Sequence, residues 1–376
     1  MHVLGRDGGT GPAVDLGTYR APDGSEGAAV GLDLDRPHTT LVVGKRGYGK
    51  SHTLGVLAEG ATRAPGVAPV LVDPMGEFGG LAGGEASVQA RVVDAPRVPA
   101  DALPPAAWPA LFGLAATDPT GALLWEAARN ADTLGAMATY VAEARVDEGV
   151  CRAARNHLGL AESWGVFGAD GLDPDALLSG EATVLDCSGL DDRAASALVR
   201  AVALGLYTAC VEGRPPRLPW LVLDEAHAFV DGVAASALET VVTRGRTPGV
   251  SLVAATQRPR ALPAVAVSQA DLVIAHRLTA TADVEALAAA APTYLDGTLR
   301  DRLPTDPGAA VVVDDVTESV HGVQVRRRET PHHGDDPRAS ARADDLDQSS
   351  SRAVPQSGHS PSTTGTGVAQ SGQNSR

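Results

Sequence analysis

Lysine occurs at only two of the 376 positions of this chain, Lys45 and Lys50, while every other basic charge outside histidine is an arginine. Both lysines lie in the stretch Gly-Lys-Arg-Gly-Tyr-Gly-Lys-Ser at residues 44–51. A lysine carries a compact ammonium group on a flexible stem, which can reach between two phosphates in a way that a planar guanidinium cannot. The retained Lys50 therefore indicates a phosphate-binding role.

The stretch fits the pattern G-x-x-x-x-G-K-[S/T], and its flanks have the composition that this pattern needs. Residues 39–43 form a short apolar, β-branched run typical of a buried strand, and residues 51–59 have the apolar spacing of a helix. Glycines between a strand and a helix let successive amides turn toward a phosphate at the positive end of the helix. The nucleotide-binding residues predicted here are Gly44, Lys45, Arg46, Gly47, Tyr48, Gly49, Lys50, Ser51 and His52.

Two adjacent carboxylates follow a second apolar run, residues 220–223, and these are Asp224 and Glu225. Parallel sheets bind ligands at the carboxyl ends of their strands, so both acids are expected beside the glycine loop. We expect Ser51 and Asp224 to hold Mg²⁺. Glu225 would orient or deprotonate the water that attacks the γ-phosphate.

A third apolar run, residues 250–255, leads to Gln257, a neutral amide that could bond the γ-phosphate or the attacking water. Just before this run, the turn at residues 243–249 presents Arg244 and Arg246. Either could neutralise transition-state charge on the ATP of a neighbouring subunit. A solvated basic turn is an equally good interpretation of the two arginines.

Asp73 and Glu77 end another apolar run, residues 68–72, within the hexapeptide Asp-Pro-Met-Gly-Glu-Phe. The same strand-end argument places them near the nucleotide, where they could support the magnesium waters or the nucleophile. Asp-Pro and glycine at these offsets are also turn residues, so a plain β-turn explains the segment equally well.

The four segments 44–51, 73–78, 223–227 (Leu-Asp-Glu-Ala-His) and 255–259 (Ala-Thr-Gln-Arg-Pro) together resemble the HerA–FtsK class of ATPases in order and spacing. The likeness spans roughly residues 39–277. It implies a RecA-like P-loop fold, a mostly parallel sheet flanked by helices, and a hexameric ring that uses ATP and Mg²⁺ to move duplex DNA. A nuclease partner is implied by the HerA branch of the class.

Residue by residue, the resemblance assigns the phosphate lysine to Lys50 and the magnesium residues to Ser51 and Asp224. It assigns the catalytic glutamate to Glu225 and the polar sensor to Gln257. Its trans-acting arginine, which lies in a Gly-Arg pair ahead of the sensor strand, best matches Arg246, with Arg244 as the second choice.

The chain is expected to have three parts. Residues 1–38 carry two or three short strand signals, enough for a small β segment but not for the substantial N-terminal barrel usual in HerA-type motors. Residues 39–330 form the ATPase domain, with a helical insertion at about 80–180. Residues 331–376 are poor in large apolar side chains and predict a disordered tail.

The formal net charge is −15, with 46 acidic against 31 basic residues, so a broad basic DNA-binding surface is not expected. Scarce lysine, abundant aspartate and 3% aromatic residues suggest a halophilic proteome. At about 1 M salt the Debye length is only about 3 Å, so acidic surfaces repel DNA weakly. The charge therefore weakens the DNA hypothesis without excluding it.

The three cysteines have no paired spacing, which favours reduced thiols and a cytoplasmic location. The ten histidines form no zinc pattern. Residues 195–210 are apolar but are interrupted by Arg200, so no membrane insertion is expected. A second hypothesis stays open: a nucleotide-dependent switch or scaffold that acts on a protein partner without DNA.

Overall fold

The computed structural model describes residues 1–83, 88–178, 180–213, 215–289, 294 and 298–331, and the predicted tail from residue 332 onward lies outside these residues. The strands are β1 (His2–Leu4), β2 (Ala13–Arg20), β3 (Glu26–Asp33), β4 (Thr39–Val43), β5 (Val67–Asp73), β6 (Ala90–Val93), β7 (Ala182–Asp186), β8 (Leu218–Leu223), β9 (Ser251–Thr256), β10 (Leu272–Ala275), β11 (Ala309–Asp314) and β12 (Ser319–Val325). The helices are α1 (Lys50–Arg63), α2 (Ala107–Leu111), α3 (Pro119–Asn130), α4 (Leu134–Glu143), α5 (Glu148–Ser163), α6 (Pro174–Leu177), α7 (Asp192–Glu212), α8 (Ala235–Arg244), α9 (Ala264–Ser268), α10 (Thr281–Ala288) and α11 (Leu299–Arg302).

The described strands form a single twelve-stranded sheet in the order β1-β3-β2-β12-β11-β10-β4-β9-β8-β5-β7-β6. From β10 to β6 every neighbouring pair is parallel. Parallel strands end at the same edge, so β4, β8 and β9 deliver the segments that follow them to one side of the sheet. The predicted α/β fold with a mostly parallel sheet is confirmed.

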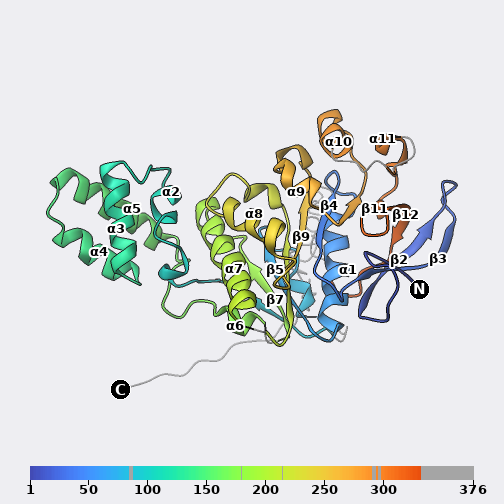
Figure 1. Cartoon of the computed structure of the whole chain (residues 1–376), viewed down its shortest axis with the longest axis horizontal. Helices are drawn as coiled ribbons and strands as arrows, with labels where there is room; N and C mark the ends of the chain where they lie inside the picture. The colour runs from blue at the N-terminus through green and yellow to red at the C-terminus, as the bar shows by residue number, and fades with distance from the viewer. Residues whose placement is uncertain (84–87, 179, 214, 290–293, 295–297, 332–376) are drawn as a thin grey trace, which may run out of the picture. The chain divides into compact units, whose positions relative to one another are not determined.

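Apolar side chains of the central strands alternate between two cores, one on each face of the sheet. In β4, Leu41 and Val43 belong to the core that also contains α7 and α8, whereas Val42 belongs to the core formed with α1. Both faces are thus covered by helices, as parallel sheets require. Figure 1 shows α7 and α8 apart from α1, with the strands between them.

The N-terminal strands add an antiparallel extension to this sheet. β2 pairs antiparallel with β3 and with β12, and β11 pairs antiparallel with both β10 and β12. β11 and β12 follow each other in the chain and pair antiparallel, so they form a hairpin. β2 also contacts α1, where a Cβ atom on Gly60 would come within 2.1 Å of the Val14 side chain. Only glycine permits that approach of helix to strand.

Helices α2 to α5 occupy the middle of the predicted helical insertion and contact one another (Figure 1). Within the predicted insertion α3 and α4 are separate helices, because α3 ends at Asn130 and the Thr133 side chain caps the start of α4. β6 also lies within the interval 80–180, where it pairs with β7 at the sheet edge. Its four half-buried residues are too few to show a strand pattern in the sequence.

Among the described helices, α7 alone is long and apolar enough to cross a membrane by length and composition. Most of it is buried within the protein, where residues such as Leu198, Val199 and Leu206 join the core on one face of the sheet. Its hydrophobic character is accounted for by that packing.

Candidate nucleotide-binding site

The glycine loop is fixed to the ends of two neighbouring strands. The backbone N–H of Gly44 donates to the Thr256 carbonyl at 3.3 Å, and that of Lys45 donates to the Arg277 carbonyl at 2.7 Å. A Cβ atom on Gly44 would lie 2.6 Å from the Cβ of His276. Gly47 and Gly49 have φ values of +79° and +113°, which side chains disfavour. These contacts give the loop the concave shape predicted from its sequence.

Helix α1 begins at Lys50, and no side chain caps its first turn. The leading N–H groups of this turn are therefore free of a side-chain acceptor and carry the positive end of the helix dipole. The Lys50 side chain is 5% exposed. A buried ammonium beside uncapped amides forms a site suited to an anion with several negative charges.

The His276 ring packs against the first turn of α1, a contact that the sequence analysis did not predict. The ring is fully buried, with Nδ1 2.8 Å from the Ala309 carbonyl and Nε2 2.9 Å from Thr53 Oγ1. Burial lowers the pKa of His276 to about 4, and the charge of Lys50 adds to this effect. The neutral ring donates from Nδ1 and accepts the Thr53 hydroxyl at Nε2. A histidine directly after an apolar strand was the available signal.

Ser51 and Asp224, 173 residues apart in the sequence, meet beside the loop. The Ser51 hydroxyl donates to Asp224 Oδ2 at 3.0 Å, and the Glu225 N–H donates to Asp224 Oδ1 at 2.8 Å. The pKa of Asp224 is raised to about 6, mainly by burial and also by the nearby charges of Glu225 and Glu77, while hydrogen bonds from the Glu225 N–H and Ser51 oppose the rise. Among the described residues the carboxylate has a hydroxyl partner and no ion pair, which suits it to a metal ion.

Ser51 and Asp224 provide one hydroxyl and one carboxylate. In the described part of the chain no cluster of three or more His, Cys, Asp or Glu residues could hold a metal ion by itself. Mg²⁺ commonly takes one or two protein oxygens and completes its shell with phosphate and water. The donor set therefore fits a magnesium ion that arrives with a nucleotide.

Glu225 adopts a left-handed backbone conformation, with φ +46° and ψ +42°. This conformation costs about 1–2 kcal/mol for a residue other than glycine. Its Oε2 atom is buried and accepts no hydrogen bond from the described residues, although His227 Nδ1 lies 3.2 Å away. Strain together with an unsatisfied oxygen is typical of a residue held ready for a ligand or water.

Gln257 lies at the same edge, and its amide Nε2 is 3.5 Å from Glu225 Oε1, at the outer limit of a hydrogen bond. His227 bridges these strand ends, because its Nδ1 is 3.3 Å from the Thr256 hydroxyl as well as close to Glu225. The structure thus brings Lys50, Ser51, Asp224, Glu225 and Gln257 together. His227 was part of the recognised motif but had no predicted role.

The Asp73 carboxylate is occupied by its own turn, which favours the turn interpretation over a nucleotide contact. It accepts the backbone N–H groups of Met75, Glu77 and Phe78 at 3.3, 3.1 and 2.8 Å. Burial raises the pKa of Asp73 against these hydrogen bonds. Glu77 is the acid of this segment whose charge is felt at Asp224.

The other loop residues line the margin of the site. Lys45 and Arg46 are exposed, while Tyr48 lies under the Arg277 guanidinium, 5.3 Å from ring centre to Cζ. His52 Nε2 is 2.8 Å from the Arg326 carbonyl, so the chain after β12 passes beside the start of α1.

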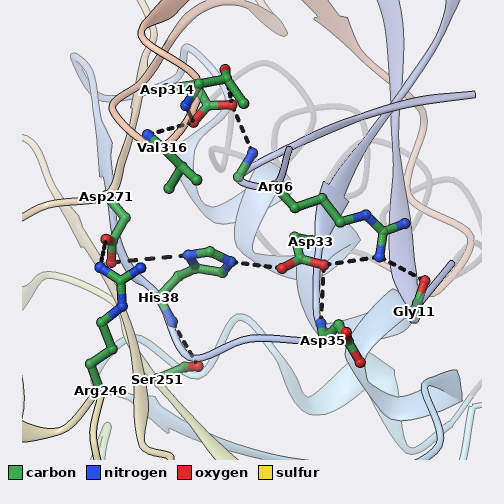
Figure 2. A network of polar contacts seen from close by, with 12 residues as sticks. Arg6, Gly11, Asp33, Asp35, His38, Arg246, Ser251, Asp271, Asp314 and Val316 are labelled. Carbon is green, nitrogen blue, oxygen red and sulfur yellow. Dashed lines mark hydrogen bonds and ion pairs between the residues drawn. The ribbon is translucent and has the colours of Figure 1, made fainter. Parts of the chain in front are cut away.

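Arg244 and Arg246 lie at the other end of the sheet. Arg244 is the exposed last residue of α8, and Arg246 follows it in the turn before β9 begins. The Arg246 guanidinium is paired with Asp271, which immediately precedes β10 (Figure 2). Neither arginine joins Lys50 and Asp224 within one chain, so any contribution to a nucleotide would have to be made in a second copy.

Residues 14–155 match the family model of the helicase HerA central domain, a span that includes the glycine loop but ends before Asp224. No curated protein matches the chain. The fold resembles VirB4 of Thermoanaerobacter pseudethanolicus, with a TM-score of 0.62 at 18% identity over 86% of this chain and 98% of that one. It also resembles the bacterial conjugative coupling protein TrwB, with a TM-score of 0.58 at 15% identity over 87% of this chain and 92% of that one.

TrwB has also been solved as a complex with ADP and Mg²⁺, and that structure matches with a TM-score of 0.58 at 16% identity over 87% of this chain and 98% of that one. The family model matches part of the chain, and the solved structures show that the chain shares their fold.

Proposed function

We propose that this protein hydrolyses ATP at the interface between copies of the chain and uses the energy to move or unwind duplex DNA as a ring. The contact that carries the proposal is the 3.0 Å hydrogen bond between Ser51 and Asp224. It joins the residue after the phosphate lysine to a buried acid that forms no ion pair with the residues the structure describes, the arrangement that a magnesium-bound nucleotide requires.

The phosphates would lie in the concave loop, where Gly47 and Gly49 turn the backbone and the start of α1 presents its amides. Lys50 would bridge the β- and γ-phosphates. Ser51 and Asp224 would hold Mg²⁺, which neutralises charge on the phosphate oxygens when bound. Binding of the nucleotide would therefore use groups that lie together in one chain.

Glu225 would act on the attacking water. Its Oε2 is unsatisfied, and the left-handed backbone directs the residue away from the line of the strand. Gln257, within 3.5 Å of Glu225, would orient the same water or the γ-phosphate. Arg246, with Arg244 as second choice, would complete the site in a neighbouring copy, because both lie at the far edge of their own sheet.

The role of DNA comes from the match to the helicase HerA central domain. A nuclease partner, a hexameric ring and a cytoplasmic location belong to the same proposal. The proposed domain assignment is residues 1–38 as a β segment, 39–330 as the ATPase and 331–376 as a tail.

The three cysteines are free and buried, and burial raises the pKa of Cys187 to about 12, so this thiol stays protonated.

ATP turnover with and without duplex DNA in about 1 M KCl tests the proposal. We expect DNA to raise turnover of the wild type. Glu225→Gln should still bind a fluorescent ATP analogue and lose at least about 100-fold in turnover, the scale of a displaced base. Lys50→Ala should lose nucleotide affinity. Glu212→Gln, an exposed change at the end of α7, serves as the matched control.

The outcomes separate the motor from its alternative. Binding by Lys50→Ala equal to wild type would refute the assigned phosphate site. Turnover that depends on Glu225 but ignores DNA, in a protein that stays monomeric, would refute the motor and favour a nucleotide-dependent switch acting on a protein partner.

A further inference from the structure

The backbone around Arg246 is held in a closed turn. The Gly245 carbonyl accepts the N–H of Gly249 at 3.1 Å and that of Val250 at 2.8 Å. Gly249 has φ +110°, and a Cβ atom there would lie 2.7 Å from the Leu218 side chain. The turn is therefore anchored against the start of β8 and has a defined shape. Arg246 projects from it with a side chain that is 63% exposed.

Asp271 fixes the guanidinium of this exposed arginine. Its Oδ1 lies 2.9 Å from Arg246 Nη1, while its Oδ2 accepts the N–H of Thr39 at 2.8 Å. The Asp271 backbone is held too, because its N–H donates to the Thr39 carbonyl at 2.9 Å and its carbonyl accepts the N–H of Asp315 at 2.9 Å. Each carboxylate oxygen thus has a separate task, one structural and one directed at Arg246.

A row of polar side chains, His38, Asp33 and Arg6, lies next to Asp271 (Figure 2). His38 lies with Nδ1 4.0 Å from Asp271 Oδ2 and Nε2 3.0 Å from Asp33 Oδ2, and Asp33 is paired with Arg6 at 3.1 Å. His38 and Asp33 are almost wholly buried. This row restricts the Asp271 side chain, which is 13% exposed, to one position.

An exposed ion pair of this kind contributes little to folding stability, because solvent screens it and the arginine loses side-chain freedom. The pair can still matter for catalysis. A charged group that is already oriented toward the charge of the transition state stabilises it without having to reorganise during the reaction. A carboxylate held in one position beside an exposed guanidinium is therefore suited to controlling where the guanidinium points.

We propose that Asp271 is a positioning residue that holds Arg246 ready to reach the triphosphate bound by a neighbouring copy of this chain. The inference rests on the proposed function, since it requires hydrolysis between copies. It adds a residue that acts only through Arg246 and touches no nucleotide. The carboxylate orients the arginine before the copies meet and shares it with the phosphate afterward.

The variant Asp271→Asn tests this, because an amide oxygen can still accept the Thr39 N–H while the negative charge that faces Arg246 is lost. We expect the kcat for ATP to fall about 10- to 100-fold with KM within about twofold, a smaller loss than for Arg246→Ala. The double variant should be no slower than Arg246→Ala alone. Asp170→Asn, in the loose exposed pair with Arg97 at 3.7 Å, is the matched control.

Mixed oligomers exclude a local effect on the glycine loop, which is a real alternative because Thr39 begins the strand leading to that loop. Subunits of Lys50→Ala lack the phosphate lysine but keep Arg246. Mixing them with Asp271→Asn subunits should restore turnover at sites where an intact arginine faces an intact loop. No recovery, or additive losses in the double variant, would overturn the positioning role.

The failures remain distinguishable. Wild-type turnover in Arg246→Ala would remove the arginine from the proposed function itself. A slow Arg246→Ala beside a normal Asp271→Asn would leave the interface chemistry standing and reject only the inference about Asp271.

Discussion

The two edges of this sheet both collect buried acids, but they neutralise them differently. At the amino edge, Asp33 has Arg6 and His38 as partners, and Asp271 has Arg246. At the carboxyl edge, Asp224 has a hydroxyl and a backbone N–H as partners, and the charges of Glu225 and Glu77 raise its pKa. Among the described residues, Asp33 and Asp271 are therefore paired with arginines, whereas Asp224 is in no ion pair.

The pKa values express this difference. Burial pushes the pKa of Asp33 upward, but hydrogen bonds from His38 and the Asp35 N–H, with the charges of His38 and Arg6, leave it below its usual value. Burial raises the pKa of Asp224 to about 6 because no comparable partner opposes it. Buried acids at strand ends of the same sheet thus differ in pKa, and their hydrogen-bond and charge partners account for the difference.

The largest effect on stability is expected from Asp33→Asn. Removing one partner of a buried ion pair typically costs about 3–5 kcal/mol, because the Arg6 guanidinium would be left without its counter-charge. The pKa of Asp33 is lowered by folding, so the stabilisation is present above the unfolded pKa and is lost as pH falls through the folded one. Urea unfolding at pH 7 and pH 3 measures it.

This variant should leave nucleotide affinity unchanged, since Asp33 lies at the amino edge. A loss of stability below about 1 kcal/mol at pH 7 would contradict the view that the amino edge is held by its charges.

The second prediction is a gain in folding stability rather than a loss. Asp224→Asn should stabilise the nucleotide-free and metal-free protein by about 3 kcal/mol at pH 8, from a shift between pKa 3.8 and about 6. A raised folded pKa means that the wild type loses stability as pH rises through about 6. The gain should therefore vanish below pH 4. Thermal unfolding in EDTA across pH 4–8 tests this, and equal stability of both proteins at pH 8 would refute the missing-cation argument.

The site's local geometry could be predicted because it follows from neighbours in sequence. Gly44 to Ser51 lie between a strand and a helix, and Asp224 and Gln257 each follow a strand, so a parallel sheet brings them to one edge. Their roles in catalysis stay predictions. Strand β6 and the break between α3 and α4 were missed, because one is short and half-buried and the other needs a cap to be seen.

The amino edge could not be predicted in the same way. Asp33, His38 and Asp271 carry no local motif, and their contact depends on how the N-terminal strands pack against β4 and β10. His276 under the glycine loop is a similar case, since its partners Thr53 and Ala309 come from distant segments. Long-range pairing of polar groups leaves no periodic pattern in a sequence.

The smallest expected effect concerns strain at the carboxyl edge. Glu225→Gly should be about 1 kcal/mol more stable than Glu225→Ala, because glycine adopts the left-handed backbone without the cost that alanine shares with glutamate. Both variants should lose hydrolysis. Glu318, exposed in the β11–β12 turn with φ +51°, provides the matched pair, where Gly over Ala should give the same gain with activity retained. If the gain appears at Glu318 but not at Glu225, the ligand-binding edge stores no backbone strain, and the contrast between the edges is one of charge alone.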